Sequence, residues 1–299
     1  MRVSQILCAA GPVDAVTNQA FAWRRRFTGW GWSGEDYVAN VAPGVTPPQL
    51  HPLGDLRDDG HVVLHYSGHA HGLEGVIGSD TLLVSHNVTP ARYFWAYQPV
   101  DAARCTLARD QLAELARAAG AVAGVSEFNA HELGQLSGRD AGVIPILFDR
   151  SGLPSPGPEP PPGPPTVLFV GRLAPHKRQD LVIRAFARFQ RRWPEARLML
   201  VGTSLTDEIE TELRALAGEL APGAVSFETA GVGPERLAQH YRSAHAFLCL
   251  SEHEGFGIPL LEAFHFEVPV IAREAGAVGE VVGDAGVLLG AEDDVATAG

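Results

Sequence analysis

The chain of 299 residues is about twice as long as a typical domain, so we expect two domains with substantial cores. Its formal net charge of −12 at pH 7 argues against a nucleic-acid-binding protein, because phosphate backbones are bound by dense basic surface. No apolar run approaches the ~20 residues that cross a bilayer, and the start of the chain does not resemble a signal peptide, so we expect a soluble, cytoplasmic protein.

The first half of the chain alternates apolar runs with helical stretches. A helix is expected to begin near Asp14, after a loop that contains Gly11. Strands are expected at residues 3–8, 61–66, 81–85, 121–125 and 143–147, and a second helix over 101–119. We interpret residues 1–150 as one Rossmann-like α/β domain.

A proline-rich segment follows this first half. Eight of the twelve residues from Pro154 to Pro165 are proline, a composition that excludes a helix and favours an extended spacer. We therefore assign residues 151–165 as a linker between two domains.

The second half shows a clearer alternation of strands and helices. Strands are expected at residues 166–170, 197–201, 224–227, 246–250 and 268–272, and helices at 180–193, 207–220, 234–243 and 259–266. Units of this length predict a parallel, doubly wound sheet over residues 166–299. Two such lobes would form an interdomain cleft at the carboxyl ends of their strands, where open α/β folds bind ligands.

The turn after the expected strand 166–170 carries two cations, Arg172 and Lys177, next to Gly171. Backbone N–H groups and cations at a strand end can bind a diphosphate. Lys177 is the only lysine among 23 basic residues, which favours a role that needs a compact ammonium group. The alternative is a solvated basic loop.

A second motif follows the expected strand 246–250. Gly255 and Gly257 let the backbone approach a ligand, Pro259 suits the first position of a helix, and Glu262 is expected in its first turn. Carboxylates at positions 254 and 262 can accept hydrogen bonds from sugar and ribose hydroxyls. The alternative is a structural role, with Glu262 complementing the helix dipole and Glu254 exposed to solvent.

The order of these motifs, followed by Val268-Pro269-Val270-Ile271-Ala272, resembles family 4 of the retaining glycosyltransferases, which have the GT-B fold. The resemblance implies that Arg172 and Lys177 hold a donor diphosphate, Glu254 contacts the transferred sugar and Glu262 binds the ribose. The donor-binding residues that it implies are Gly11, Gly171, Arg172, Lys177, Glu254, Gly255, Phe256, Gly257 and Glu262.

The first half is compatible with the same family and would be its acceptor-side domain. The segment from Ser85 to Pro90, Ser-His-Asn-Val-Thr-Pro, resembles a strand-end motif of some bacterial members, which implies that His86 lies beneath the donor sugar and helps to position the reacting groups. The loop at Gly11 matches the family's first strand–helix turn but lacks its usual paired glycines. By resemblance, the catalytic residues are His86, Arg172, Lys177 and Glu254.

Neither a metal nor a cofactor is expected. His65, His69 and His71 are close together in sequence, but no cysteine or carboxylate accompanies them at a ligand spacing. Family resemblance implies metal-independent catalysis in which the nucleotide sugar is a substrate. Cys8, Cys105 and Cys249 are interpreted as buried thiols.

The sequence therefore predicts a retaining glycosyltransferase of carbohydrate biosynthesis that uses a UDP- or GDP-linked sugar and an unknown acceptor. One alternative is a GT-B sugar-nucleotide epimerase, and another is a phosphorylase-like enzyme with pyridoxal phosphate on Lys177. A third is a non-catalytic or truncated sugar-nucleotide-binding protein, since the C-terminal end looks shortened for the family. The basic run Arg24-Arg25-Arg26 beside Trp23 is interpreted as a solvated helix face, so membrane association is not favoured.

Overall fold

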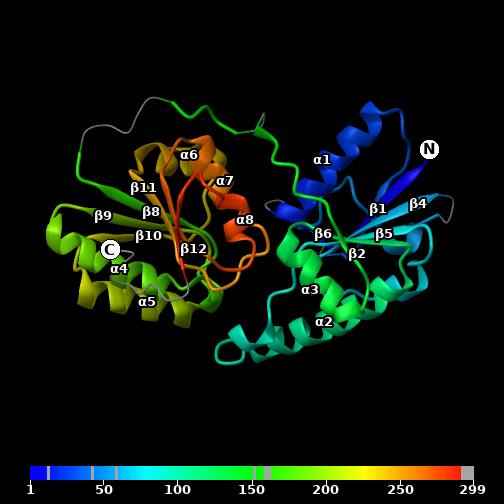
Figure 1. Cartoon of the computed structure of the whole chain (residues 1–299), viewed down its shortest axis with the longest axis horizontal. Helices are drawn as coiled ribbons and strands as arrows, with labels where there is room; N and C mark the ends of the chain where they lie inside the picture. The colour runs from blue at the N-terminus through cyan, green and yellow to red at the C-terminus, as the bar shows by residue number, and fades with distance from the viewer. Residues whose placement is uncertain (12–13, 42–43, 58–59, 151–152, 158–162, 291–299) are drawn as a thin grey trace. The chain divides into compact units, whose positions relative to one another are not determined.

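The computed structural model describes residues 1–11, 14–41, 44–57, 60–150, 153–157 and 163–290. The chain forms two compact units, Met1–Leu147 and Phe148–Gly299, each built on one sheet (Figure 1). The α/β fold with two Rossmann-like sheets is therefore confirmed, while the cleft between them stays a prediction. Part of the proline-rich segment and the C-terminal residues 291–299 lie outside the described residues. Among the residues described, no helix combines the length and apolar character that crossing a bilayer requires.

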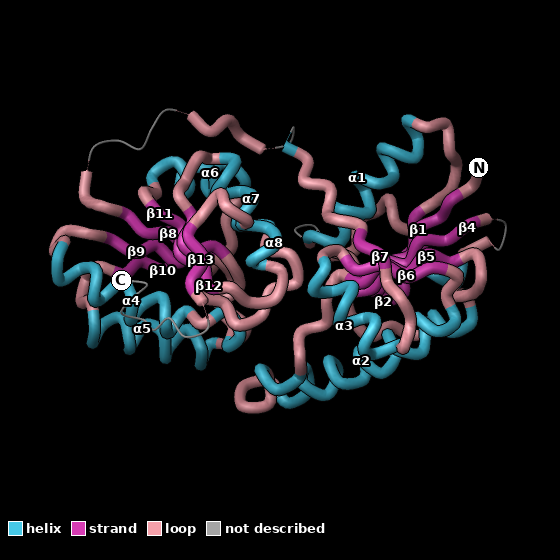
Figure 2. The backbone as a smooth tube through the Cα atoms, in the orientation of Figure 1, coloured by secondary structure: helices cyan, strands magenta, loops and turns pink. Residues whose placement is uncertain are grey.

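The strands of the first unit lie together in one sheet (Figure 2). This sheet has seven parallel strands in the order β3-β2-β1-β4-β5-β6-β7. The strands are β1 (Val3–Ala9), β2 (Asp36–Asn40), β3 (His51–Pro52), β4 (His61–Tyr66), β5 (Thr81–Ser85), β6 (Ala121–Gly124) and β7 (Gly142–Val143). The helices are α1 (Ala15–Gly29), α2 (Pro99–Ala118) and α3 (Glu127–Ser137).

The helices of this unit cover opposite faces of the sheet, with α1 on one face and α2 and α3 on the other (Figure 1). Successive side chains of a strand point to opposite faces. Ile6 accordingly packs in the cluster that contains Leu112 of α2 and Leu133 of α3, whereas its neighbour Leu7 packs with Ala20 of α1. Strand β1 is therefore buried on both faces.

The sheet of the second unit has six parallel strands in the order β10-β9-β8-β11-β12-β13. The strands are β8 (Thr166–Val170), β9 (Arg197–Val201), β10 (Val225–Glu228), β11 (Ala246–Cys249), β12 (Val270–Arg273) and β13 (Val287–Leu289). The helices are α4 (Gln179–Arg192), α5 (Asp207–Leu220), α6 (Pro234–Ser243), α7 (Ile258–His265) and α8 (Val278–Val282). Helices α4 and α5 lie on one face and α6, α7 and α8 on the other (Figure 1).

Both sheets have a point at which the strand order reverses. It lies between β1 and β4 in the first unit and between β8 and β11 in the second. Ligands of open α/β sheets bind outside the carboxyl ends of the strands at such a point. The loops after β8 and β11 carry the two predicted donor motifs, so the topology places both motifs where a ligand is expected.

The expected strands and helices are confirmed to within two residues, with one exception. The strand expected over 143–147 is reduced to Gly142–Val143, since Pro145 cannot donate a ladder hydrogen bond. Strands β2, β3 and β13 and helices α3 and α8 were not expected. The interpretation of all three cysteines as buried thiols is wrong for Cys105, which is half-buried on α2.

Candidate active site

The turn that follows β8 is fixed against β9. The N–H of Gly171 donates to the carbonyl of Val201 at 2.9 Å, and Gln179 Nε2 donates to the carbonyl of Arg172 at 2.9 Å. The Arg172 side chain is exposed, and no ion pair of its guanidinium occurs within the described residues. Arg172 is therefore a cation on a rigid turn with its charge available to a ligand.

Lys177 ends the short 3₁₀ helix Pro175–Lys177, and its ammonium group pairs with Glu254 of the second motif. The Nζ–Oε1 distance is 2.6 Å, and the side chains are 19% and 12% exposed. The hydroxyl of Ser251 donates to the same carboxylate oxygen at 2.9 Å. The structure thus brings together two predicted site residues that are 77 positions apart, and it contradicts the alternative in which Glu254 is simply solvated.

The Glu254 loop is held by backbone contacts on two sides. Its neighbour Glu252 donates its N–H to the carbonyl of His176 at 2.8 Å. On the other side, Ala277 N–H donates to the Glu254 carbonyl at 3.0 Å, and Gly276 has φ +58°. A Cβ atom at Gly276 would lie 2.3 Å from the Glu254 carbonyl oxygen, so only glycine permits this approach.

Glu262 lies on α7 and is largely buried. Tyr241 of α6 donates its hydroxyl hydrogen to Glu262 Oε2 at 2.8 Å, and burial raises the pKa of the carboxyl group. The expectation that Glu262 lies in the first turn is wrong, because α7 begins at Ile258 and Glu262 is its fifth residue. The dipole of α7 therefore does not explain a negative charge on Glu262, because the effect of a helix dipole falls off within the first turn.

The glycines of the second motif shape the start of α7. Gly257 has φ +90° and is the residue that precedes the helix, while Phe256 and Gly255 connect it to Glu254. Phe256 is half-buried. These residues lie together with Glu254 at the carboxyl end of β11, as expected for one binding loop.

Two features beside this loop were not predicted. Arg178 is bonded to both Asp180 and Glu252, and these carboxylates raise the pKa of its guanidinium, so its charge is already paired. His176 is buried, and burial together with the Lys177 charge lowers its pKa to about 3, so this imidazole is neutral. Proximity to a strand end in the sequence was the only available signal for either residue.

In the first unit, Gly11 and His86 follow β1 and β5 at the same edge of the sheet. His86 Nε2 lies 3.0 Å from Nδ1 of His65, a buried residue of β4. The N–H of Gly11 donates to Thr17 Oγ1 at 3.3 Å, and a Cβ atom at this glycine would meet only Asp14, at 3.8 Å. The structure therefore shows no steric need for glycine at position 11. The predicted roles of both residues stay predictions.

A polar pocket of about 540 Å³ opens beside the segment that follows His86. It is lined by Asn40, Ser67, Gly68, His69, His71, Asn87, Val88, Thr89, Phe94, Arg104, Cys105 and Ala108. Asn40, Ser67 and Asn87 come directly from, or just after, the ends of β2, β4 and β5, so the pocket opens at the carboxyl edge of the sheet. Across the described residues, no group of three or more His, Cys, Asp or Glu side chains could hold a metal ion, and His69 and His71 instead line this pocket.

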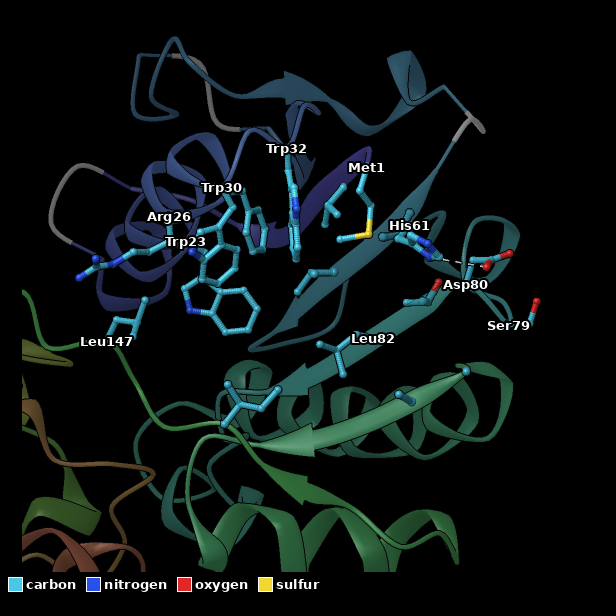
Figure 3. Close-up of a pocket in the computed structure, with 18 of the residues that line it drawn as sticks. Met1, Trp23, Arg26, Trp30, Trp32, His61, Ser79, Asp80, Leu82 and Leu147 are labelled. Carbon is cyan, nitrogen blue, oxygen red and sulfur yellow. Dashed lines mark ion pairs between the residues drawn. The ribbon is translucent and has the colours of Figure 1, made fainter.

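A larger pocket of about 890 Å³ contains none of the predicted site residues (Figure 3). Its walls are mainly apolar and include Trp23, Trp30 and Trp32. Val3, His61, Thr81 and Ala121 also line it, and these residues begin or lie near the beginning of their strands. Because α/β sheets bind ligands at the opposite, carboxyl ends, we do not assign this pocket to the site.

The second half of the chain matches a known protein family. Residues 155–298 match the family model "Glycosyl transferases group 1". A D-inositol 3-phosphate glycosyltransferase of Acidothermus cellulolyticus is 36% identical over 141 residues, which cover 44% of this chain and 32% of that protein. A GDP-mannose-dependent alpha-(1-6)-phosphatidylinositol monomannoside mannosyltransferase of Mycolicibacterium smegmatis is 35% identical over 127 residues, which cover 40% and 32%. The match thus spans about a third of the length of these curated relatives.

The likeness in fold extends over the whole chain. The solved structure of sucrose-phosphate synthase from Thermosynechococcus elongatus superimposes with a TM-score of 0.73 at 18% identity and covers 100% of this chain and 88% of that chain. At this identity the likeness shows the fold alone. Residues 155–298 are thus similar to the group 1 glycosyl transferases, and the two units have the GT-B fold.

Proposed function

We propose that this protein is a retaining, metal-independent glycosyltransferase that moves a sugar from a nucleoside-diphosphate sugar to an acceptor hydroxyl. The observation that carries the proposal is the ion pair between Lys177 and Glu254 at the strand reversal of the second unit. The same turn carries Arg172, which is exposed and forms no ion pair with the residues that the structure describes. Two cations and a carboxylate at one strand edge suit the two ends of such a donor, its diphosphate and its sugar.

In the proposed reaction the bond between the anomeric carbon and the diphosphate oxygen breaks, and a bond to the acceptor oxygen forms on the same face. The acceptor proton leaves with the departing diphosphate. Negative charge grows on the diphosphate, and Arg172 and Lys177 stabilise it by preorganised electrostatics. Because these two side chains supply positive charge where other enzymes use a divalent cation, the reaction needs no metal.

The two carboxylates would bind hydroxyl groups. Glu254 is held by Ser251 and Lys177 and would accept hydrogen bonds from the transferred sugar. Glu262 uses Oε2 for Tyr241, which leaves Oε1 for the ribose. We assign neither carboxylate a covalent role.

The acceptor would bind in the polar pocket of the first unit. Its lining offers amide, hydroxyl and imidazole groups with a single arginine, Arg104, and so suits a polyhydroxylated acceptor better than an apolar one. One relative's name specifies GDP-mannose as donor, and a solved structure of similar fold is a complex with UDP and glucose, so guanosine and uridine donors are both candidates for this chain. We place the reaction in the cytoplasm.

The test is a panel of UDP- and GDP-linked sugars with the purified chain. Calorimetry identifies the nucleotide that binds, and NMR then follows the anomeric configuration of the sugar that is released to water or to a polyol. We expect binding of one nucleotide class and a product that keeps the configuration of the donor. An inverted product would contradict retention, and an epimerised sugar nucleotide would indicate the epimerase instead.

A further inference from the structure

Three contacts join the turn that carries Lys177 to the loop that carries Glu254. One is the ion pair between these two residues themselves. The second is the backbone hydrogen bond from the N–H of Glu252 to the carbonyl of His176, at 2.8 Å. The third is an ion pair between the guanidinium of Arg178 and the carboxylate of Glu252. The residue that follows the lysine is thus bound to a residue two positions before the glutamate that pairs with the lysine.

The guanidinium of Arg178 is held from two directions. Its Nε and Nη2 atoms donate to the two carboxylate oxygens of Asp180 at 2.9 Å and 3.0 Å, and its Nη1 atom donates to Glu252. Asp180 lies in the first turn of α4, so the guanidinium is fixed to the start of a helix. The planar fork of an arginine suits such a two-point contact, which adds geometric specificity to the charge pairing. Arg178 therefore connects α4 to the Glu254 loop.

The backbone of Arg178 is also unusual. It has φ +50° and ψ 44°, in the left-handed region that is unfavourable for a residue with a Cβ atom. Among the residues that the structure describes, Asn87 and Glu267 are the other non-glycine residues with positive φ. Such a conformation persists where surrounding contacts hold it. The pairs with Asp180 and Glu252 are contacts of this kind, and they fix the corner at which the lysine turn meets α4.

We propose that Arg178 and Glu252 are positioning residues that hold the ammonium group of Lys177 beside Glu254, where it meets the donor diphosphate. The ligand in this inference rests on the proposed function, whereas the link between the turn and the loop does not. The charge of Arg178 is shared by two carboxylates, so we assign this residue no contact with the diphosphate. Its effect on the ligand passes through Lys177.

A different explanation would be that Arg178 and Glu252 act on the diphosphate through their charges alone. Removal of the Glu252 carboxylate separates the two explanations. Arg273 Nη1 also lies 3.5 Å from Glu252 Oε1, so Glu252→Ala leaves two guanidinium groups with less negative charge beside them. Charge alone would then make a diphosphate bind more tightly. Loss of positioning makes it bind more weakly, so the sign of the change decides.

NMR of the full-length chain tests the positioning without any ligand. Lys177 is the only lysine, so labelling with carbon-13 lysine reports on this side chain alone. The two hydrogen atoms on its Cε atom should give separate signals in the unchanged chain, because the side chain is held in one conformation. In Arg178→Gly and in Glu252→Ala the two signals should move together, since the side chain then samples several rotamers.

Calorimetry with uridine and guanosine diphosphate tests the effect on binding. Arg178→Gly removes the link but suits the left-handed backbone, so the variant should fold. We expect it and Glu252→Ala to weaken the diphosphate that the unchanged chain binds by about threefold to tenfold. Glu252→Gln should retain most of the affinity, because its amide oxygen can still accept from Arg178. The matched control is Glu267→Gly, which places glycine at an exposed residue with φ +58° and should alter neither measurement.

The outcomes separate this inference from the proposed function. Unaltered affinity in Arg178→Gly, or tighter binding in Glu252→Ala, would overturn the positioning role. Unaltered lysine signals in both variants would overturn it as well, even if binding changed. If the unchanged chain binds neither diphosphate, the proposed function is refuted, and the lysine signals still decide whether Arg178 and Glu252 position Lys177.

Discussion

Lys177 and Glu254 are bound to each other, with 2.6 Å between Nζ and Oε1. The only lysine of the chain is therefore held by the carboxylate that we assign to the sugar, and both side chains are preorganised before a ligand enters. The contact also means that Glu254 opposes the binding of a diphosphate at Lys177, while it favours the sugar.

Replacement of Glu254 by glutamine should separate these two effects. Glu254→Gln keeps an acceptor for Ser251 but removes the negative charge, so we expect nucleoside-diphosphate affinity to be unchanged or higher. Turnover of the sugar nucleotide should fall by about 100-fold or more, because the charge near the transferred sugar is lost. Calorimetry and a product assay measure the two quantities. Glu219→Gln, on the exposed surface of α5, is the control, and a fall in diphosphate affinity in Glu254→Gln alone would contradict this role.

The negative charge of Glu262 should lower the stability of the folded protein and strengthen the binding of the nucleotide. Burial raises its pKa, so the ionised form is disfavoured in the folded state, and the resulting loss of stability develops as pH rises through the pKa of the unfolded chain to the raised value. We expect Glu262→Gln, which cannot ionise, to raise the free energy of unfolding near pH 7. Denaturant unfolding at pH 7 measures it.

The same variant should bind the nucleotide several times more weakly, because a carboxylate accepts hydrogen bonds from ribose more strongly than an amide does. A 2′,3′-dideoxynucleoside diphosphate is the matched ligand control, since it lacks both hydroxyls and should not distinguish Glu262 from glutamine. Equal weakening for the two nucleotides would show that Glu262 does not bind the ribose.

Gly276 should be intolerant of a side chain. In Gly276→Ala the new Cβ atom would meet the Glu254 carbonyl at 2.3 Å in a left-handed backbone conformation, so the Glu254 loop must shift. We expect a loss of about 1–3 kcal/mol in unfolding free energy and weaker donor binding. Gly218→Ala, within α5 and with open space around its Cβ position, should instead stabilise the protein by about 0.5–1 kcal/mol. Similar unfolding midpoints for the two variants would refute the steric argument.

Asp36 is the buried acceptor that Gln5 and Arg24 share in the first unit. Removal of this buried carboxylate in Asp36→Ala leaves Arg24 and Gln5 without their shared acceptor, so we expect a loss of about 3–5 kcal/mol from the unfolding transition of that unit. Asp101→Ala breaks an exposed pair with Arg104 and should cost about 0–1 kcal/mol. Thermal unfolding followed by calorimetry compares the two, and equal effects would contradict this role of Asp36.

The sequence predicted the parts of the fold that local pattern determines. The runs 61–66 and 81–85 are apolar enough to be recognised as buried strands, and β4 and β5 have those bounds. Helix α3 was missed although Ser126 caps it by accepting a hydrogen bond from Asn129 N–H, because polar residues there also suit a loop. Strand β2 lacks the alternation that marks a half-buried strand.

The donor motifs were likewise found from sequence, but their partners were not. Tyr241 and Glu262 meet only because α6 and α7 pack on the same face of the sheet, 21 residues apart in the chain. The contact of Gln5 with His65 depends on the pairing of β1 with β4, and polar residues inside apolar strands give no local signal for such a pair. Contacts of this kind arise from tertiary packing between residues far apart in the chain, and no local sequence pattern predicts them.

The most direct test of the donor site is calorimetry with Lys177→Ala against three ligands that share one base: the nucleoside, its diphosphate and its sugar diphosphate. Arg188→Ala, an exposed arginine on α4, is the charge-matched control. We predict that Lys177→Ala weakens both diphosphates by tenfold or more, about 1.4 kcal/mol, and leaves the nucleoside unchanged, while Arg188→Ala alters none of the three. Unaltered diphosphate binding in Lys177→Ala would contradict the assignment of this site.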